Sequence, residues 1–157
     1  MNANQRTLDV FIENPKGSIA KIHHDEVALV PTHCELVGAP YAYAYGFVVG
    51  VPSGDGDMLD CFVISEQTLY TGDRLDCIPI GYLEQWQNGD EDHDIIAIPA
   101  SEAHLIDSTD VAEVVETLRA FIGQVFSTIP DRTLSVGDFH NAQAAYDLVD
   151  ELTPKID

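Results

Sequence analysis

The sequence predicts an α+β protein, in which a small closed antiparallel β-barrel carries flanking helices near its C-terminal end. The first two-thirds of the chain consists of short runs rich in β-branched and aromatic residues, bounded by Gly, Pro, Asp and Asn. The last third changes to the period of an amphipathic helix. A chain of 157 residues with 45% hydrophobic content can bury one core, so residues 1–157 are expected to form a single domain.

Six apolar runs in the first two-thirds are predicted to be strands. They span residues 8–13, 26–31, 45–51, 59–65, 75–85 and 94–99. No helical pattern interrupts these runs, which favours antiparallel neighbours in a barrel or a sandwich. We expect the closed barrel.

Two helices are predicted to follow the strands. The first carries apolar residues at helical spacing from Val111 to Val125, and Asp110 with Glu113 three residues later is typical of a helix N-terminus. The second spans residues 141–152 and has its small and apolar side chains on one face. These faces are expected to pack on the outside of the barrel.

The charge of the chain excludes one class of partner. With 27 acidic and 7 basic residues, the net charge of −20 repels a phosphate backbone, so nucleic acid is not an expected partner. No apolar run is long enough for a membrane span, and the first residues lack the apolar segment of a signal peptide. Three cysteines without C-x-x-C spacing favour free thiols. We therefore expect a cytoplasmic protein.

The stretch GDGDMLD places Asp55, Asp57 and Asp60 between two predicted strands. Two acids spaced two apart on an extended segment point the same way, and such carboxylates can surround Mg²⁺. A polar hairpin turn is the alternative, because Asp-Gly is a common turn signal. Asp60 favours the metal site, since a turn does not require an acid inside the following apolar run.

A second acidic stretch, NGDEDHD, precedes the last predicted strand and contains Asp92. Alone, such a stretch is typical of a solvated loop. Beside the first acidic loop it could supply a further metal ligand. Glu13, at the end of the first strand, is a third acid next to an apolar run.

Five segments together resemble the soluble family I inorganic pyrophosphatases. They are VFIENPKGSIAKI, YAYAYGF, GDGDMLDCFVI, PIGYLEQWQNGDEDHDIIAIP and FHNAQAAYDLV, and the resemblance covers roughly residues 8–150. It implies a five-stranded OB-like barrel with flanking helices. It also implies Mg²⁺-dependent hydrolysis of inorganic diphosphate to two phosphates, without a covalent intermediate.

The resemblance assigns the acids to a metal centre of two or more ions. Asp55, Asp60 and Asp92 match the residues that hold the first metal, and Asp60 also bridges to a second. Asp57 matches the carboxylate that orients and deprotonates the attacking water, and Glu13 matches an outer metal ligand. This chemistry is coherent, because cations lower the pKa of a shared water and a carboxylate accepts its proton.

The resemblance also implies which residues meet the phosphate-containing substrate. Lys21 matches a phosphate-binding lysine, and Tyr41 and Tyr45 match two tyrosines that line the pocket. His33 stands where the family has an arginine and is kept as a substrate-binding candidate. Asp57, Lys21 and Tyr45 are thus the catalytic candidates.

Several phosphate-binding positions depart from the family pattern. Asp94 replaces a lysine, Val125 and Phe126 replace a tyrosine-lysine pair, and His23 replaces a glutamate. Two alternatives therefore stay open beside diphosphate hydrolysis. One is a catalytically degenerate, metal-binding paralogue. The other is a hydrolase that acts on a different phosphate compound, with Mn²⁺, Co²⁺ or Zn²⁺ in place of Mg²⁺. The resemblance further implies a homo-oligomer, in bacterial relatives often a hexamer.

Overall fold

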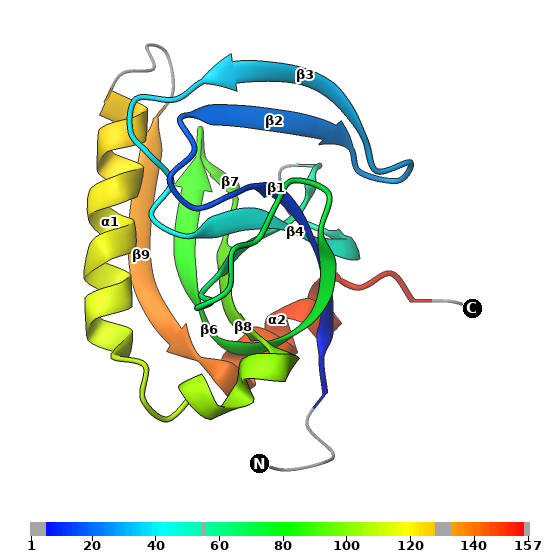
Figure 1. The fold of residues 1–157 in the computed structure, drawn as a ribbon, viewed down its shortest axis with the longest axis vertical. Helices are drawn as coiled ribbons and strands as arrows, with labels where there is room; N and C mark the ends of the chain where they lie inside the picture. The colour runs from blue at the N-terminus through cyan, green and yellow to red at the C-terminus, as the bar shows by residue number, and fades with distance from the viewer. Residues whose placement is uncertain (1–5, 55, 128–132, 156–157) are drawn as a thin grey trace.

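The computed structural model describes residues 6–54, 56–127 and 133–155, and Figure 1 shows the arrangement of its elements. The strands are β1 (Leu8–Asn14), β2 (Ala20–Asp25), β3 (Val30–Leu36), β4 (Ala44–Pro52), β5 (Met58–Val63), β6 (Arg74–Gln87), β7 (Asp90–Glu91), β8 (Asp94–Pro99) and β9 (Leu134–Asn141). The helices are the 3₁₀ segment η1 (Ala100–Leu105), α1 (Val111–Ser127) and α2 (Ala142–Leu152).

Five strands close into a barrel, as predicted. They are hydrogen-bonded in the order β1-β4-β5-β8-β6, and β6 returns to pair with β1, which leaves a ring of strands visible in Figure 1. The sheet is mixed, because β8 lies between β5 and β6 and runs parallel to β5, whereas the other pairs in the ring are antiparallel. Between β5 and β8 the chain runs back through β6, so β8 can pair with β5 in the parallel direction.

The hairpin of β2 and β3 forms a separate two-stranded sheet that lies beside the barrel, above β1 and β4 in the view of Figure 1. The prediction of a strand over residues 26–31 was wrong, because most of this segment is the turn of the hairpin. The Oδ1 atom of Asp25 accepts hydrogen bonds from the backbone N–H groups of Val27 and Ala28, at 3.0 and 2.7 Å. This aspartate-directed turn overrides the strand preference of the apolar residues inside it.

The structure adds β9, which the sequence did not predict. It pairs with β6, where Gly81 lies opposite Asn141. A Cβ atom at position 81 would lie 2.2 Å from the carbonyl oxygen of His140, so the close approach of the two backbones requires glycine there.

Both predicted helices are confirmed, and they cover different parts of the barrel. Asp110 Oδ1 accepts a hydrogen bond from the Glu113 N–H at 3.2 Å, and Asn141 Oδ1 caps α2 through the Ala144 N–H at 3.0 Å. Helix α1 packs Leu118 and neighbouring residues against β6 and β8, while α2 closes the other core cluster. Among the described helices, none is long and apolar enough to cross a membrane.

Candidate functional site

A cavity of about 270 Å³ lies between the hairpin β2–β3, helix α1 and the barrel strands β4, β5, β6 and β8. Its polar wall is formed by Lys21, His23, Glu35, Tyr41, Tyr45, Asp57, Asp60, Gln85, Gln87, Asp92 and Asp94. Its apolar wall is formed by Leu36, Val37, Phe62, Phe121, Ile122 and Val125. The cavity brings together most of the residues that the sequence predicted as a site.

Two neighbouring strands place carboxylates in the cavity. Asp60 on β5 is directly opposite Asp94 on β8 in the parallel ladder, and Asp92 lies two residues before Asp94. Asp92 and Asp94 are only 5% and 2% exposed. Burial of several like charges in one small space is costly unless protons or cations offset it.

Gln85 on β6 positions Asp92, a role that the sequence did not predict. The Asp92 N–H donates to the Gln85 carbonyl oxygen at 2.8 Å, and Gln85 Nε2 donates to Asp92 Oδ2 at 3.2 Å. The Gln85 N–H in turn donates to Nδ1 of His93 at 3.0 Å. Nothing in the sequence distinguishes Gln85 from an ordinary polar residue of a strand, so its contact with Asp92 could not be predicted.

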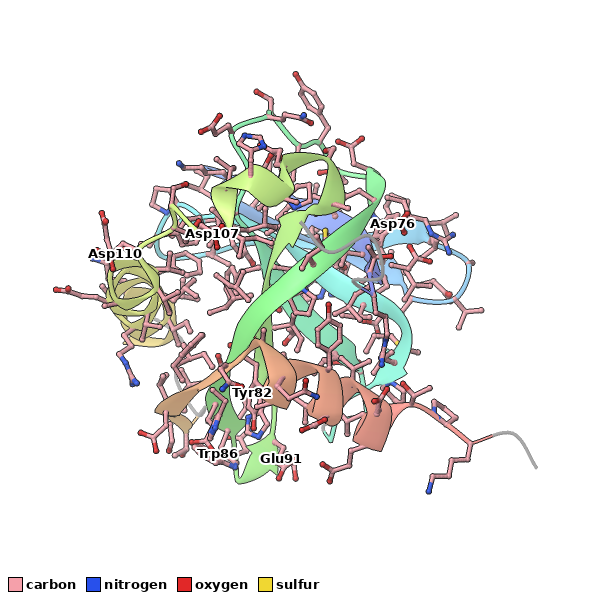
Figure 2. The ribbon with its side chains drawn as sticks, turned by 90° about the horizontal axis from the view of Figure 1, so that it is seen from below. Asp76, Tyr82, Trp86, Glu91, Asp107 and Asp110 are labelled. Atoms are coloured by element: carbon pink, nitrogen blue, oxygen red, sulfur yellow. The ribbon has the colours of Figure 1, made fainter. Side chains whose placement is uncertain are left out.

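Aromatic contacts hold His93 from two directions. Its ring lies 5.4 Å from the indole ring of Trp86 and 5.6 Å from the ring of Tyr82. Figure 2 shows Trp86 and Glu91 at the same end of the molecule, on the paired strands β6 and β7. The loop that carries Asp92 is thus fixed at its base, beside the cavity.

Asp60 is an acid of the cavity whose pKa is raised, to about 7. Burial is the largest cause and the negative charge of Asp94 adds to it, whereas hydrogen bonds with Asp92 and from the Tyr45 hydroxyl oppose the rise, as does the charge of Lys21. A hydrogen bond between two carboxyl groups requires a proton that a bound cation could replace. Carboxylate oxygens are the donors that hard divalent cations prefer.

Three predicted site residues, Lys21, Tyr41 and Tyr45, lie together. The Lys21 ammonium is 5.8 Å from the ring centre of Tyr45, whose ring stacks on that of Tyr41 at 5.3 Å. Burial raises the pKa of both phenols well above their ordinary value. Both hydroxyls therefore stay protonated and can donate hydrogen bonds at neutral pH.

Two predicted site residues lie outside the cavity lining. Glu13 is 8% exposed at the end of β1, with Oε2 3.2 Å from Nδ1 of His24, and burial raises its pKa to about 7. His33 is exposed on β3 and stacks on His23 with ring centres 4.1 Å apart. His23 itself lines the cavity, and its Nε2 lies 2.8 Å from Glu35 Oε1.

The first acidic loop forms the turn between β4 and β5. The Ser53 N–H donates to the Asp57 carbonyl oxygen at 2.6 Å, and Gly56 has φ +91°, so the segment turns here while Asp57 lines the cavity. Asp55 lies outside the described residues. Within the described chain, no three His, Cys, Asp or Glu side chains are close enough to hold a metal ion by themselves.

The sequence did not predict the apolar wall of the cavity. Its α1 residues carry the i, i+3, i+4 spacing that indicates core packing, and they do belong to a core cluster. Their second role, facing a cavity, depends on how far the hairpin stands from the helix. The spacing of apolar residues along the sequence does not indicate how far the hairpin lies from helix α1.

Comparisons with known proteins agree with this arrangement. A family model described as "Inorganic pyrophosphatase" matches residues 10–156. The inorganic pyrophosphatase of Halalkalibacterium halodurans is 28% identical over 156 residues, which is 96% of each chain. That of Nanoarchaeum equitans is 30% identical over 145 residues, 88% of this chain and 91% of the relative.

Solved structures show the same fold. The inorganic pyrophosphatase of Helicobacter pylori superposes with a TM-score of 0.84 at 21% identity, covering 97% of this chain and 94% of the other. A structure from Neisseria gonorrhoeae, also described as an inorganic pyrophosphatase, gives a TM-score of 0.85 at 21% identity and covers 97% and 92%.

Proposed function

We propose that this chain, which belongs to the inorganic pyrophosphatase family, hydrolyses inorganic diphosphate to two phosphates. The observation that carries the proposal is that Asp57, Asp60, Asp92 and Lys21 line one cavity although they come from three separate parts of the chain. A metal-assisted hydrolysis needs carboxylates that bind the metal and a positively charged side chain, here Lys21, that binds the phosphate.

The proposed cofactor is Mg²⁺, which Asp60 and Asp92 would hold together with Asp55, and Glu13 would be an outer ligand. These residues are suitable ligands for Mg²⁺, because they offer carboxylate oxygens. Burial disfavours the ionised forms of Asp60 and Glu13, and a bound cation would stabilise those forms. A bound cation supplies charge neutralisation and makes a nearby water more acidic.

The side chains of the chain then have distinct roles. Asp57 accepts the proton of the attacking water while the water oxygen bonds to phosphorus and the bridging P–O bond breaks. Lys21 binds the phosphoryl group that is attacked, and the neutral Tyr45 hydroxyl orients Asp60 by donating a hydrogen bond. Tyr41 supports Tyr45 by stacking, and His33 would contribute through its contact with His23 at the rim.

The proposal is tested by measuring phosphate release from inorganic diphosphate with Mg²⁺, Mn²⁺, Co²⁺ and Zn²⁺ in parallel. Release is expected with at least one of these metals, and a chelator should abolish it. A protein that binds the metals by calorimetry but releases no phosphate would instead be the degenerate, metal-binding paralogue. Asp94, a buried acid where the family resemblance implies a lysine, is the feature that favours this second candidate.

The metal-free protein is expected to lose stability as the pH rises. The pKa values of Asp60 and Glu13 are raised to about 7 from 3.8 and 4.5, so their contribution is most favourable below about pH 4 and is lost as the pH passes through 7. A shift of this size corresponds to at most roughly 4 kcal/mol per group. The Tm without metal should fall by about 5–15 °C between pH 5 and pH 8.

Thermal melts at pH 5 and pH 8, with Mg²⁺ and with a chelator, measure this effect. Mg²⁺ should raise the Tm more at pH 8, where the carboxylates are ionised. The variant Asp60→Asn should reduce the change of the Tm between the two pH values. Asp76 is an exposed acid on β6 (Figure 2), so the variant Asp76→Asn should leave that change as it is. An unchanged Tm between the two pH values in the chelated protein would contradict the expectation.

We also propose a homo-oligomer, a hexamer by family resemblance, in a reducing cytoplasm. The three cysteines are free thiols, and Cys61 and Cys77 are buried. Light scattering of the purified chain tests the oligomeric state.

A further inference from the structure

We infer that the cavity accepts a diphosphate that carries a short apolar substituent at one end, such as an alkyl diphosphate. This inference rests on the proposed hydrolysis and adds the substrate class. The cavity has a polar wall, where the reaction is proposed to take place, and an apolar wall, in which Phe62 and Phe121 also pack against Tyr45 and Tyr41.

The apolar wall is continuous from helix α1 to the hairpin. Phe121, Ile122 and Val125 contribute from α1, and Phe62 contributes from β5. The backbone around Val37 is fixed against the start of β2, where its N–H donates to the Ile19 carbonyl oxygen at 2.8 Å. The wall is thus built on fixed elements.

Leu36 extends the apolar wall to the mouth of the cavity. It lines the cavity from the end of β3 and yet is 79% exposed. An exposed leucine needs no explanation on its own, but this one lines a cavity that also contains buried apolar side chains beside a polar site. An apolar group of a ligand would cover it.

The charges of the cavity favour a diphosphate that carries fewer negative charges. Glu35, Asp57, Asp60, Asp92 and Asp94 are acidic, and Lys21 is the one lysine or arginine among the described lining residues. Even with bound divalent cations, most of the positive charge is needed to offset these carboxylates. An alkyl group removes one ionisable oxygen from diphosphate, and so it lowers the charge that the cavity must meet.

The size and composition of the cavity fit a small organic molecule. Its volume of about 270 Å³ is close to the lower end, roughly 300 Å³, of pockets that hold small ligands. Such pockets combine apolar walls with a few polar groups that fix the orientation of the ligand. The phosphates would lie at Lys21 and the alkyl group at Val125 and Leu36.

The reaction on this substrate is the same displacement. The water oxygen bonds to the terminal phosphorus, its proton goes to Asp57, and the bond from that phosphorus to the bridging oxygen breaks. The products are inorganic phosphate and an alkyl phosphate, which leaves with the electron pair of the broken bond. No oxidant or further reactant is needed.

The test compares kcat/KM for inorganic, methyl, ethyl, propyl and butyl diphosphate, with both products followed by phosphorus NMR. Burial of each added methylene should raise kcat/KM by up to about fourfold along the alkyl series. The variant Leu36→Lys should lower the ratio of butyl to inorganic diphosphate at least tenfold. Val30→Lys is the matched control, because Val30 is an exposed residue of the same strand that does not line the cavity.

The outcomes separate this inference from the proposed function. Rapid hydrolysis of inorganic diphosphate with no gain along the alkyl series would overturn the inference and leave the function intact. Equal ratios in Leu36→Lys and Val30→Lys would overturn it as well. If no diphosphate is hydrolysed with any metal, the proposed function and the inference both fall.

Discussion

The variant Asp57→Asn is expected to lower kcat for diphosphate hydrolysis by about 10²- to 10⁴-fold, the usual contribution of a positioned general base. The asparagine amide has nearly the same shape but cannot accept the proton of the water. Asp57 is an exposed residue of the β4–β5 turn, so the substitution should leave the Tm within about 2 °C. Phosphate release and thermal melts measure the two effects.

A matched control removes the same charge elsewhere. Asp107, an exposed acid in the turn between η1 and α1 (Figure 2), does not line the cavity, so Asp107→Asn should retain full turnover. If Asp57→Asn kept turnover within threefold of the unsubstituted protein, another group would have to accept the proton, and the assignment of Asp57 would be wrong.

The position of Asp60 in the cavity could be predicted from the sequence, because this carboxylate interrupts an apolar strand. Asp60 stands inside a strand whose other central residues are buried, and such an interruption is visible in a single sequence. Gln85 and the apolar wall were missed for the opposite reason. An amide in a half-buried strand and a valine on an apolar helix stripe are both compatible with ordinary packing.

The same distinction applies to the fold. Barrel strands with strong apolar runs were predicted within a few residues of their observed ends, whereas β9 was not, because its half-buried alternation is weak. The parallel pairing of β5 with β8 was also missed, since the order of strands in a sheet depends on packing and not on the composition of either strand. The turn after Asp25 shows that one local hydrogen-bond acceptor can override an apolar run.

The variant Asp94→Lys is expected to increase kcat/KM for inorganic diphosphate by about 10- to 150-fold. A charge-assisted hydrogen bond to phosphate contributes roughly 1.5–3 kcal/mol, and the substitution also removes a buried like charge beside Asp60. Because Asp60 lies opposite position 94 in the ladder, the new ammonium would have a carboxylate partner in the absence of substrate. Circular dichroism and steady-state kinetics on the same samples measure fold and activity together.

The variant Asp94→Asn separates the two contributions, because it removes the negative charge without adding a positive one. It should give a gain smaller than that of Asp94→Lys on inorganic diphosphate, and neither variant should improve butyl diphosphate to the same degree. A loss of turnover in both folded variants would contradict the expectation and would mean that the Asp94 carboxylate itself binds a cation needed for the reaction. In that case Asp94 would be a further ligand of the metal centre, and the positive charge that meets the phosphates would have to come from the bound cations and Lys21.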